Sequence, residues 1–139
     1  MKPRRGDCSR PVCYSMKYVT IQNLTNPQEP LVAGYCASFW CRLRGLMFRR
    51  SLPSQQGLLL VQARDSRVDS SIHMLFMWMD LGVVWINGVG KVVDLILAKK
   101  WRPAYFPQRP ARYILEIPVK YLGLFHIGDK IRFEEAWLD

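Results

Sequence analysis

The chain has 139 residues, half of them hydrophobic, and a formal net charge of +9. This length fits one domain with its own core, and the apolar content excludes a largely disordered chain. No stretch approaches the ~18 uninterrupted apolar residues of a membrane span, and the basic start is not followed by the apolar run of a secretory signal. The sequence therefore predicts a cytoplasmic protein without a membrane span.

The first 17 residues differ from the rest of the chain. They are polar and basic, contain Pro3 and Pro11, and show no apolar period. We expect residues 1–17 to form a flexible basic N-terminal extension in front of a single domain over residues 18–139. Because the first strand pattern begins just after Met16, the alternative is that the native chain starts near Met16.

Beyond the extension, apolar residues recur mostly with the period of two that is typical of half-buried strands. Two segments, Gly57–Val61 and Ile72–Met79, are instead apolar on both faces. Residues 62–71 are polar and are expected to form a loop. The predicted strands are Tyr18–Leu24, Leu31–Tyr35, Gly57–Val61, Ile72–Met79, Val83–Ile86, Lys91–Ala98, 112–117 and 130–134.

One segment has a helical period instead. Phe39, Leu43, Leu46 and Met47 recur at i, i+4, i+7 and i+8, and Ser38 is a suitable N-cap. A second, single helical turn is expected over Lys120–Phe125. The sequence therefore predicts one short amphipathic helix and one helical turn.

The connections favour antiparallel pairing. Asn87-Gly88 separates two strand patterns, and Asn-Gly readily takes positive φ at both central positions of a tight hairpin. No long alternation of strands and helices is present, so the sequence disfavours a doubly wound nucleotide-binding sheet. We predict a mainly β fold, an antiparallel sandwich or jelly-roll-like barrel with one short amphipathic helix.

Several motifs in this order resemble one family, the domain of unknown function 192. Arg44-Gly45-Leu46-Met47-Phe48-Arg49 is similar to its central element, and Ile72-His73 with Phe76-Met77 to its aromatic–methionine strand. Further matches are Gly57-Leu58-Leu59-Leu60, Gly90-Lys91-Val92-Val93, Pro103, Leu115-Glu116 and Gly128-Asp129. The resemblance implies a small, mainly β domain, and it implies no activity because none is established for the family.

Two positions depart from the family pattern. Gly82 stands where the family has an aspartate, with Asp80 two residues earlier, and Lys120 stands near a position that tends to be glycine. Two residues keep one face of a strand only if the backbone is regular. The first departure puts any role for a carboxylate at position 82 in doubt.

The positive charge is clustered, and clustered charge attracts polyanions. No nucleic-acid recognition module accompanies it, so a basic but inert surface is the simpler interpretation. If nucleic acid or another acidic polymer is bound, the candidate contacts are Arg42, Arg49 and Arg50 in one group and Lys99, Lys100 and Arg102 in another.

The four cysteines offer a weak metal site. Cys8 and Cys13 share a C-x4-C spacing with Cys36 and Cys41, which is at the loose edge of zinc-ligand spacings. Free thiols are the default in a reducing compartment, and zinc or a disulfide is the alternative. No metal or other cofactor is predicted.

No catalytic set is visible either. The chain has no nucleophile-elbow motif, and Glu116, which shares a strand face with Arg112, is expected to form a surface ion pair. His73 is more typical of a pocket edge than of a catalytic centre. We therefore expect a non-enzymatic domain that binds a small molecule or a protein partner, although an enzyme of unknown reaction remains an alternative. The predicted pocket contains Arg44, Gly45, Met47, His73, Met77 and Trp78.

Overall fold

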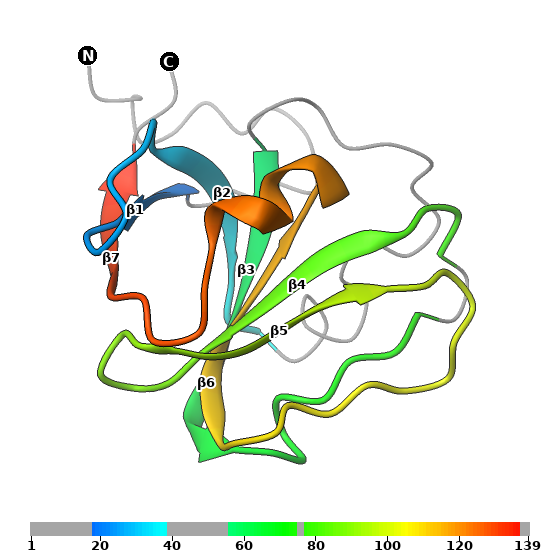
Figure 1. Ribbon diagram of the computed structural model, residues 1–139. Helices are drawn as coiled ribbons and strands as arrows, with labels where there is room; N and C mark the ends of the chain where they lie inside the picture. Colours follow the sequence, from blue (N-terminus) through cyan, green and yellow to red (C-terminus); the bar gives the residue numbers. More distant parts are fainter. Residues whose placement is uncertain (1–17, 39–55, 75–76, 137–139) are drawn as a thin grey trace, which may run out of the picture.

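The computed structural model describes residues 18–38, 56–74 and 77–136 (Figure 1). The helix expected over 39–47 lies outside these residues. The elements described are β1 (Tyr18–Asn23), β2 (Leu31–Cys36), β3 (Gln56–Ser66), β4 (Leu81–Ile86), β5 (Val92–Ala98), β6 (Ala111–Ile117), the 3-10 helix η1 (Val119–Leu124) and β7 (Ile131–Ala136).

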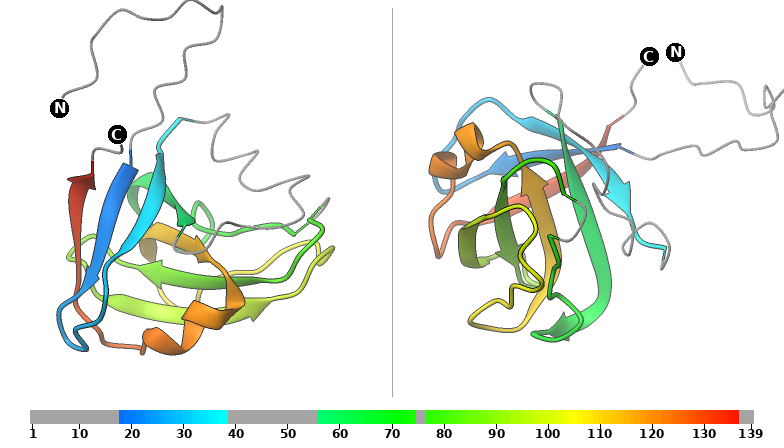
Figure 2. Two further views of the ribbon diagram at one scale, coloured as in Figure 1. Left: turned by 90° about the horizontal axis from the view of Figure 1, so that it is seen from above. Right: turned by 90° about the vertical axis from the view of Figure 1, so that its right-hand side faces the viewer.

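The strands form a single sheet in the order β5-β4-β6-β3-β2-β1-β7. The sheet curls into a half-barrel, with β7, β1 and β2 on one limb and β4 and β5 on the other (Figure 2). The predicted mainly β class is confirmed. The sheet is mixed rather than fully antiparallel, because β2 and β3 are parallel. A parallel pair needs a crossover of about a dozen residues or more, and the connection from Cys36 to Gln56 is long enough.

The two edges of the curled sheet approach each other at one end. An isolated bridge joins Lys91, just before β5, to Lys130, just before β7. The Ile131 amide donates to the Gly90 carbonyl at 2.7 Å, and the Gly128 amide donates to the Val92 carbonyl at 2.8 Å. Gly90 has a φ of 86°, and a Cβ there would lie 2.8 Å from the Ile131 carbonyl oxygen. Only glycine allows this close approach.

Most of the predicted strands are confirmed, with two corrections around the polar loop. β3 runs on to Ser66, so the loop expected from residue 62 begins later. Within the strand expected over Ile72–Met79, the described residues 72–74 and 77–79 do not lie in a strand. Ile72 makes an isolated bridge with Tyr105, and β4 begins at Leu81. The helical turn expected near Lys120 is η1, which packs on β4 and β5.

The β4–β5 hairpin forms, but not with the predicted geometry. Positive φ occurs at Gly90 and not at Asn87 or Gly88. The Gly90 amide donates to the Asn87 carbonyl at 3.0 Å, and the Asn87 side chain accepts from the Val89 and Lys91 amides. The Asn-Gly pair therefore opens a longer turn that ends on a left-handed glycine.

Both faces of the central strands are buried, in two separate clusters. The inner cluster includes residues from both limbs and Phe125, which directly follows η1, so it fills the space that the curl encloses. The outer cluster lies on the opposite face of β3, β6 and β4, where a segment between β3 and β4 covers it. The inner cluster consists of Val19, Ile21, Leu31, Ala33, Leu59, Val84, Ile86, Val92, Leu115, Ile117, Phe125 and Ile131. The outer cluster consists of Cys36, Leu58, Leu60, Ile72, Met74, Met77, Leu81, Val83, Trp85, Ala98, Ala111 and Ile114.

Candidate functional site

Glu116 lies on the outer face of the central strand β6 and is only 6% exposed. Its neighbours across the sheet are Leu58 on β3 and Val83 on β4, and both belong to the outer cluster. The Oε2 atom is buried without a hydrogen-bond partner. Burial in this apolar setting disfavours the charged form and raises the pKa of Glu116 to about 7.

The other buried carboxylates of the described residues are satisfied. Asp94 accepts from the Leu95 and Gln108 amides, each at 2.9 Å. Asp129 accepts from the Asn23 side chain and the His126 amide. Buried polar groups are normally paired, so the carboxyl of Glu116 calls for a functional explanation.

The surface ion pair expected between Glu116 and Arg112 is wrong for the part of the chain that the structure describes. Arg112 donates instead from Nε to the Gln62 carbonyl at 3.1 Å. The sequence correctly predicts that the two side chains share a face of β6. It does not show that β3 and β4 flank Glu116 on both sides, or that this end of the face is buried.

Described residues of the connection between β3 and β4 cover part of the outer face without forming a strand. Ile72, Met74 and Met77 are buried in the outer cluster, and Met77 is only 3% exposed. His73 is half-buried between Ile72 and Met74. Met77 therefore acts as a core residue in this structure, and His73 stands in the sequence between two members of the same cluster. The remaining members of the predicted pocket, Arg44, Gly45 and Met47, lie outside the described residues.

Trp78 and Trp101 form an aromatic pair at the surface. Their ring centroids are 5.6 Å apart and the rings are perpendicular. Trp78 is 49% exposed and Trp101 is 44% exposed. An aromatic ring contributes most to stability when it is fully buried, so neither ring makes its full contribution here. Trp101 has a φ of 68° and is the non-glycine residue with positive φ in the described part of the chain. Such a conformation is costly and is often found at functional sites.

Three hydrogen bonds fix the turn that carries Trp101. The Lys99 amide donates to the Tyr105 hydroxyl at 2.9 Å, and the Lys100 amide donates to Asp80 Oδ1 at 2.8 Å. The Trp101 amide donates to the Met74 carbonyl at 2.7 Å. Asp80 therefore holds this turn and does not replace the missing acid at position 82.

Positively charged residues flank Trp101 in its turn. Lys99, Lys100 and Arg102 are exposed residues of the same turn. We call these three residues with Trp78 and Trp101 the tryptophan–lysine surface. The other predicted basic group, Arg42, Arg49 and Arg50, lies outside the described residues. Trp101 was not predicted as a site residue. An aromatic residue inside the basic run 99–102 can nevertheless be recognised from the sequence as a candidate contact.

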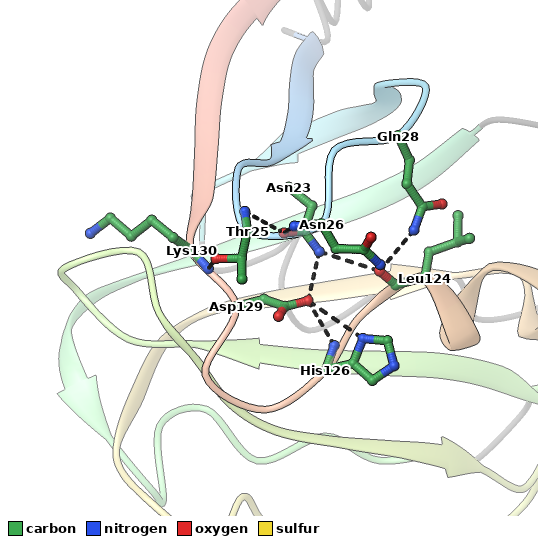
Figure 3. A network of polar contacts seen from close by, with 8 residues as sticks. All are labelled: Asn23, Thr25, Asn26, Gln28, Leu124, His126, Asp129 and Lys130. Atoms are coloured by element: carbon green, nitrogen blue, oxygen red, sulfur yellow. Dashed lines mark hydrogen bonds and ion pairs between the residues drawn. The ribbon is translucent and has the colours of Figure 1, made fainter.

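A second polar cluster, at the far end of the sheet, has a structural role. The Asn23 side chain donates to Asp129 Oδ2 at 2.7 Å, and Asn23 Oδ1 accepts from the Thr25 and Asn26 amides (Figure 3). These bonds join the β1–β2 turn to the loop before β7. A cavity of about 10 Å³ beside it is about the size that one water needs.

Cys36 differs from the free thiol expected by default. Cys36, buried at the end of β2, is disulfide-bonded. Cys8, Cys13 and Cys41 lie outside the described residues. Among the residues that are described, no three histidine, cysteine or acidic side chains gather as metal ligands. No helix in the same part of the chain is long and apolar enough to span a membrane.

Gly82, the departure from the family pattern, faces the inner cluster. A Cβ at this position would lie 3.2 Å from Ile117 Cγ1 and 3.2 Å from Leu122 Cβ. Leu122 of η1 therefore occupies the space beside β4 that a longer side chain at position 82 would need. This packing gives a physical reason for the glycine.

Two solved structures share this fold. One, from Sinorhizobium meliloti, is described as a candidate transcription regulator; its TM-score is 0.74 at 21% identity, covering 88% of this chain and 96% of that chain. The other, from Novosphingobium aromaticivorans, is a protein of unknown function with a TM-score of 0.74 at 19% identity, covering 88% of this chain and 89% of that chain.

Similar sequences occur in archaea. UPF0127 protein TK1120 of Thermococcus kodakarensis is 42% identical over 96 residues, covering 68% of this chain, and UPF0127 protein PF1050 of Pyrococcus furiosus is 35% identical over 115 residues, covering 80% of this chain. The alignment spans 59% of the length of TK1120, 63% of a relative from Thermococcus gammatolerans and 95% of PF1050. Residues 20–133 match the model of the family described as "Uncharacterized ACR". The chain therefore belongs to this family, the domain of unknown function 192.

Proposed function

We propose that this protein is a binding domain and that the tryptophan–lysine surface binds single-stranded nucleic acid. The observation that carries the proposal is the half-exposed pair of Trp78 and Trp101 beside three exposed cations on one fixed turn. Sequence-tolerant single-strand binders combine the same two parts, aromatic rings for the bases and cations for the backbone.

The rigidity of the turn supports a binding role for the tryptophan–lysine surface. Its backbone is held by Tyr105, Asp80 and Met74, which come from three places outside the turn. A preformed surface loses less conformational entropy when it binds. The structural relative described as a candidate transcription regulator shares the fold only, so the proposal rests on this surface.

The test is fluorescence anisotropy of a labelled 12-nucleotide single strand across a range of salt concentrations. If three cations contact phosphates, the logarithm of the affinity should fall with the logarithm of the salt concentration with a slope of about −2. Trp101→Ala should weaken binding by about fivefold or more, since stacking on one base is worth about 1–3 kcal/mol.

Two variants control for unspecific effects. Phe106→Ala removes an exposed aromatic ring from the same loop, and Lys91→Gln removes an exposed cation near the β4–β5 turn. Both should bind the strand as the unmodified protein does. Equal losses in Trp101→Ala and Phe106→Ala, or no retention of the strand at low salt, would reject the proposal.

A small-ligand pocket on the outer face is a second candidate. The observation in its favour is the unpartnered Glu116 Oε2, a hydrogen-bond acceptor on the face that Met77 also occupies. A thermal-shift screen of small hydrogen-bond donors tests it. Stabilisation that persists unchanged in both His73→Ala and Glu116→Gln would count against this pocket.

A further inference from the structure

Three loops meet at the end of the half-barrel where the two edges of the sheet approach each other. They are the β1–β2 turn, the β4–β5 turn and the loop between η1 and β7, on the left of the view in Figure 1. The Leu24 amide donates to the Lys130 carbonyl at 2.8 Å, and the Ile131 amide donates to the Gly90 carbonyl at 2.7 Å. These two hydrogen bonds join all three loops to one another, so the structure presents them as one surface.

Each of the three loops carries an exposed apolar side chain. Leu24 is 48% exposed in the β1–β2 turn, Val89 is 70% exposed in the β4–β5 turn, and Ile127 is 67% exposed in the loop before β7. We call these three residues the apolar tips. Apolar side chains that are exposed singly are common on any protein, whereas a group of them on neighbouring loops is typical of an interaction surface.

Two exposed lysines lie directly beside the apolar tips. The Lys130 ammonium donates to the Val89 carbonyl, and an isolated backbone bridge joins Lys130 to Lys91. Lys91 Cε lies 4.0 Å from the position that a Cβ on Gly128 would take, and Gly128 directly follows Ile127. Positive charge therefore stands next to two of the three tips.

The acidic residues near these loops have contacts of their own. Asp65 accepts from the Gly88 amide at 2.8 Å, and the buried Asp129 accepts from the Asn23 side chain at 2.7 Å. Glu29 borders the small cavity beside Asn23. Because the chain has a net charge of +9, an anionic surface attracts it as a whole, and the two lysines place part of that charge at the tips.

We infer that the apolar tips, together with Lys91 and Lys130, insert shallowly into the surface of an anionic lipid membrane. Shallow insertion buries apolar side chains at the boundary of the acyl chains, while lysine ammonium groups stay among the lipid phosphates. Small apolar groups on separate loops suit a soft lipid surface, whereas a protein partner is typically bound through one closely packed interface core.

This surface is separate from the tryptophan–lysine surface. Leu81 pairs with Ala98 at one end of the β4–β5 hairpin, and Trp101 follows that end. The turn that carries Val89 is at the other end, and the six residues of β4 span about 20 Å. The inference therefore goes beyond the proposed function and does not depend on it.

The experiment measures co-sedimentation of the full chain with phosphatidylcholine vesicles that contain about 30% phosphatidylserine, and with pure phosphatidylcholine vesicles. The unmodified protein should bind the anionic vesicles about tenfold more tightly, and about 1 M salt should remove most of this preference. The double variant Lys91→Gln/Lys130→Gln should lose the preference. No binding to the anionic vesicles would overturn the inference and would leave the tips as a contact for a protein.

Matched variants separate the apolar tips from other exposed residues. Val89→Ser/Ile127→Ser should bind the anionic vesicles about tenfold more weakly, because less apolar area enters the lipid. Val119→Ser removes an exposed valine beyond the end of β6, where Ile117 pairs with Gly82, and should bind as the unmodified protein does. Equal losses in the two proteins would overturn the inference.

Trp101→Ala distinguishes this inference from the proposed function. Tryptophan and lysine also favour membrane interfaces, so the tryptophan–lysine surface is the competing membrane contact. Trp101→Ala should keep its vesicle binding, and Lys91→Gln/Lys130→Gln should keep its binding to the single strand. Loss of vesicle binding in Trp101→Ala alone would overturn the inference. If the single strand does not bind at all, the membrane result still stands.

If a variant does not fold, the unmodified protein still decides the question. Nitroxide-labelled lipid in anionic nanodiscs broadens the NMR signals of amides that come close to it. The amides of Leu24, Val89 and Ile127 should lose more intensity than those of Leu97 and Val119, which are also exposed apolar residues. Uniform loss over these five amides, or greater loss at Leu97 and Val119, would overturn the inference.

Discussion

The two faces of the central strands differ in what covers them. The inner face is covered by β1, β2, β7 and η1, which are held by ladders or helical hydrogen bonds, and its cluster is entirely apolar. The outer face is covered in part by Ile72, Met74 and Met77, which lie outside the strands, and it contains a buried carboxyl, Glu116, whose Oε2 has no hydrogen-bond partner. The inner face therefore maintains the fold, whereas the outer face combines a core with features that stability alone does not explain.

The largest expected effect tests whether the outer cluster is a true core. Trp85 is completely buried there and donates from Nε1 to the Ser70 carbonyl at 2.7 Å. Trp85→Ala should lower the free energy of unfolding by about 3–5 kcal/mol, and Leu115→Ala on the inner face by about 2–5 kcal/mol. Chemical denaturation measures both. A loss below about 1 kcal/mol for Trp85→Ala would mean that the inner cluster alone sustains the fold.

The second effect is a pH dependence of the free energy of unfolding, which arises from Glu116 on the outer face. Glu116 keeps its proton in the folded state up to about pH 7, but in the unfolded state only up to about 4.5. Unfolding between these values releases a proton, so the free energy of unfolding should fall as pH rises from about 4.5 to about 7 and then level off. The whole difference corresponds to about 3 kcal/mol. Urea denaturation across pH 4.5 to 8 should show this slope in the unmodified protein, and Glu116→Gln should lack it.

A smaller effect is expected from restoring the family's acid on the inner face. Gly82→Asp should destabilise the protein by about 1–3 kcal/mol, because the carboxylate would enter the space of Leu122 and Ile117 without a partner. Gly123→Ala is the control, since a Cβ there meets nothing within 4 Å. Thermal unfolding of both variants gives the comparison. A Gly82→Asp protein as stable as the control would mean that η1 moves aside easily.

The smallest change in stability is expected at the binding surface. Arg102→Gln and Lys100→Gln should each alter the free energy of unfolding by less than about 0.5 kcal/mol, since both side chains are exposed. The same variants should weaken binding of the single strand and make the salt dependence shallower. A variant that loses both stability and affinity would show that the turn belongs to the core and is not an exposed binding surface.

The candidate site was predictable only in part. The basic run 99–102 and Trp78 were identified from residue type, because charge and aromaticity are properties of single residues. The role of Trp101 depends on its turn, which Met74, Asp80 and Tyr105 hold from outside. The burial of Glu116 depends on β3 and β4, and neither is adjacent to β6 in sequence.

The sequence by itself determined the mainly β class and the family, because alternating apolar residues and short motifs are local properties of the chain. Only the tertiary structure decided the curl of one mixed sheet, the parallel pairing of β2 with β3 and the covering of the outer face. These features come from contacts between residues far apart in the chain. A period of two shows which side chains share a face, but the strands and loops that arrive from elsewhere decide whether water reaches that face.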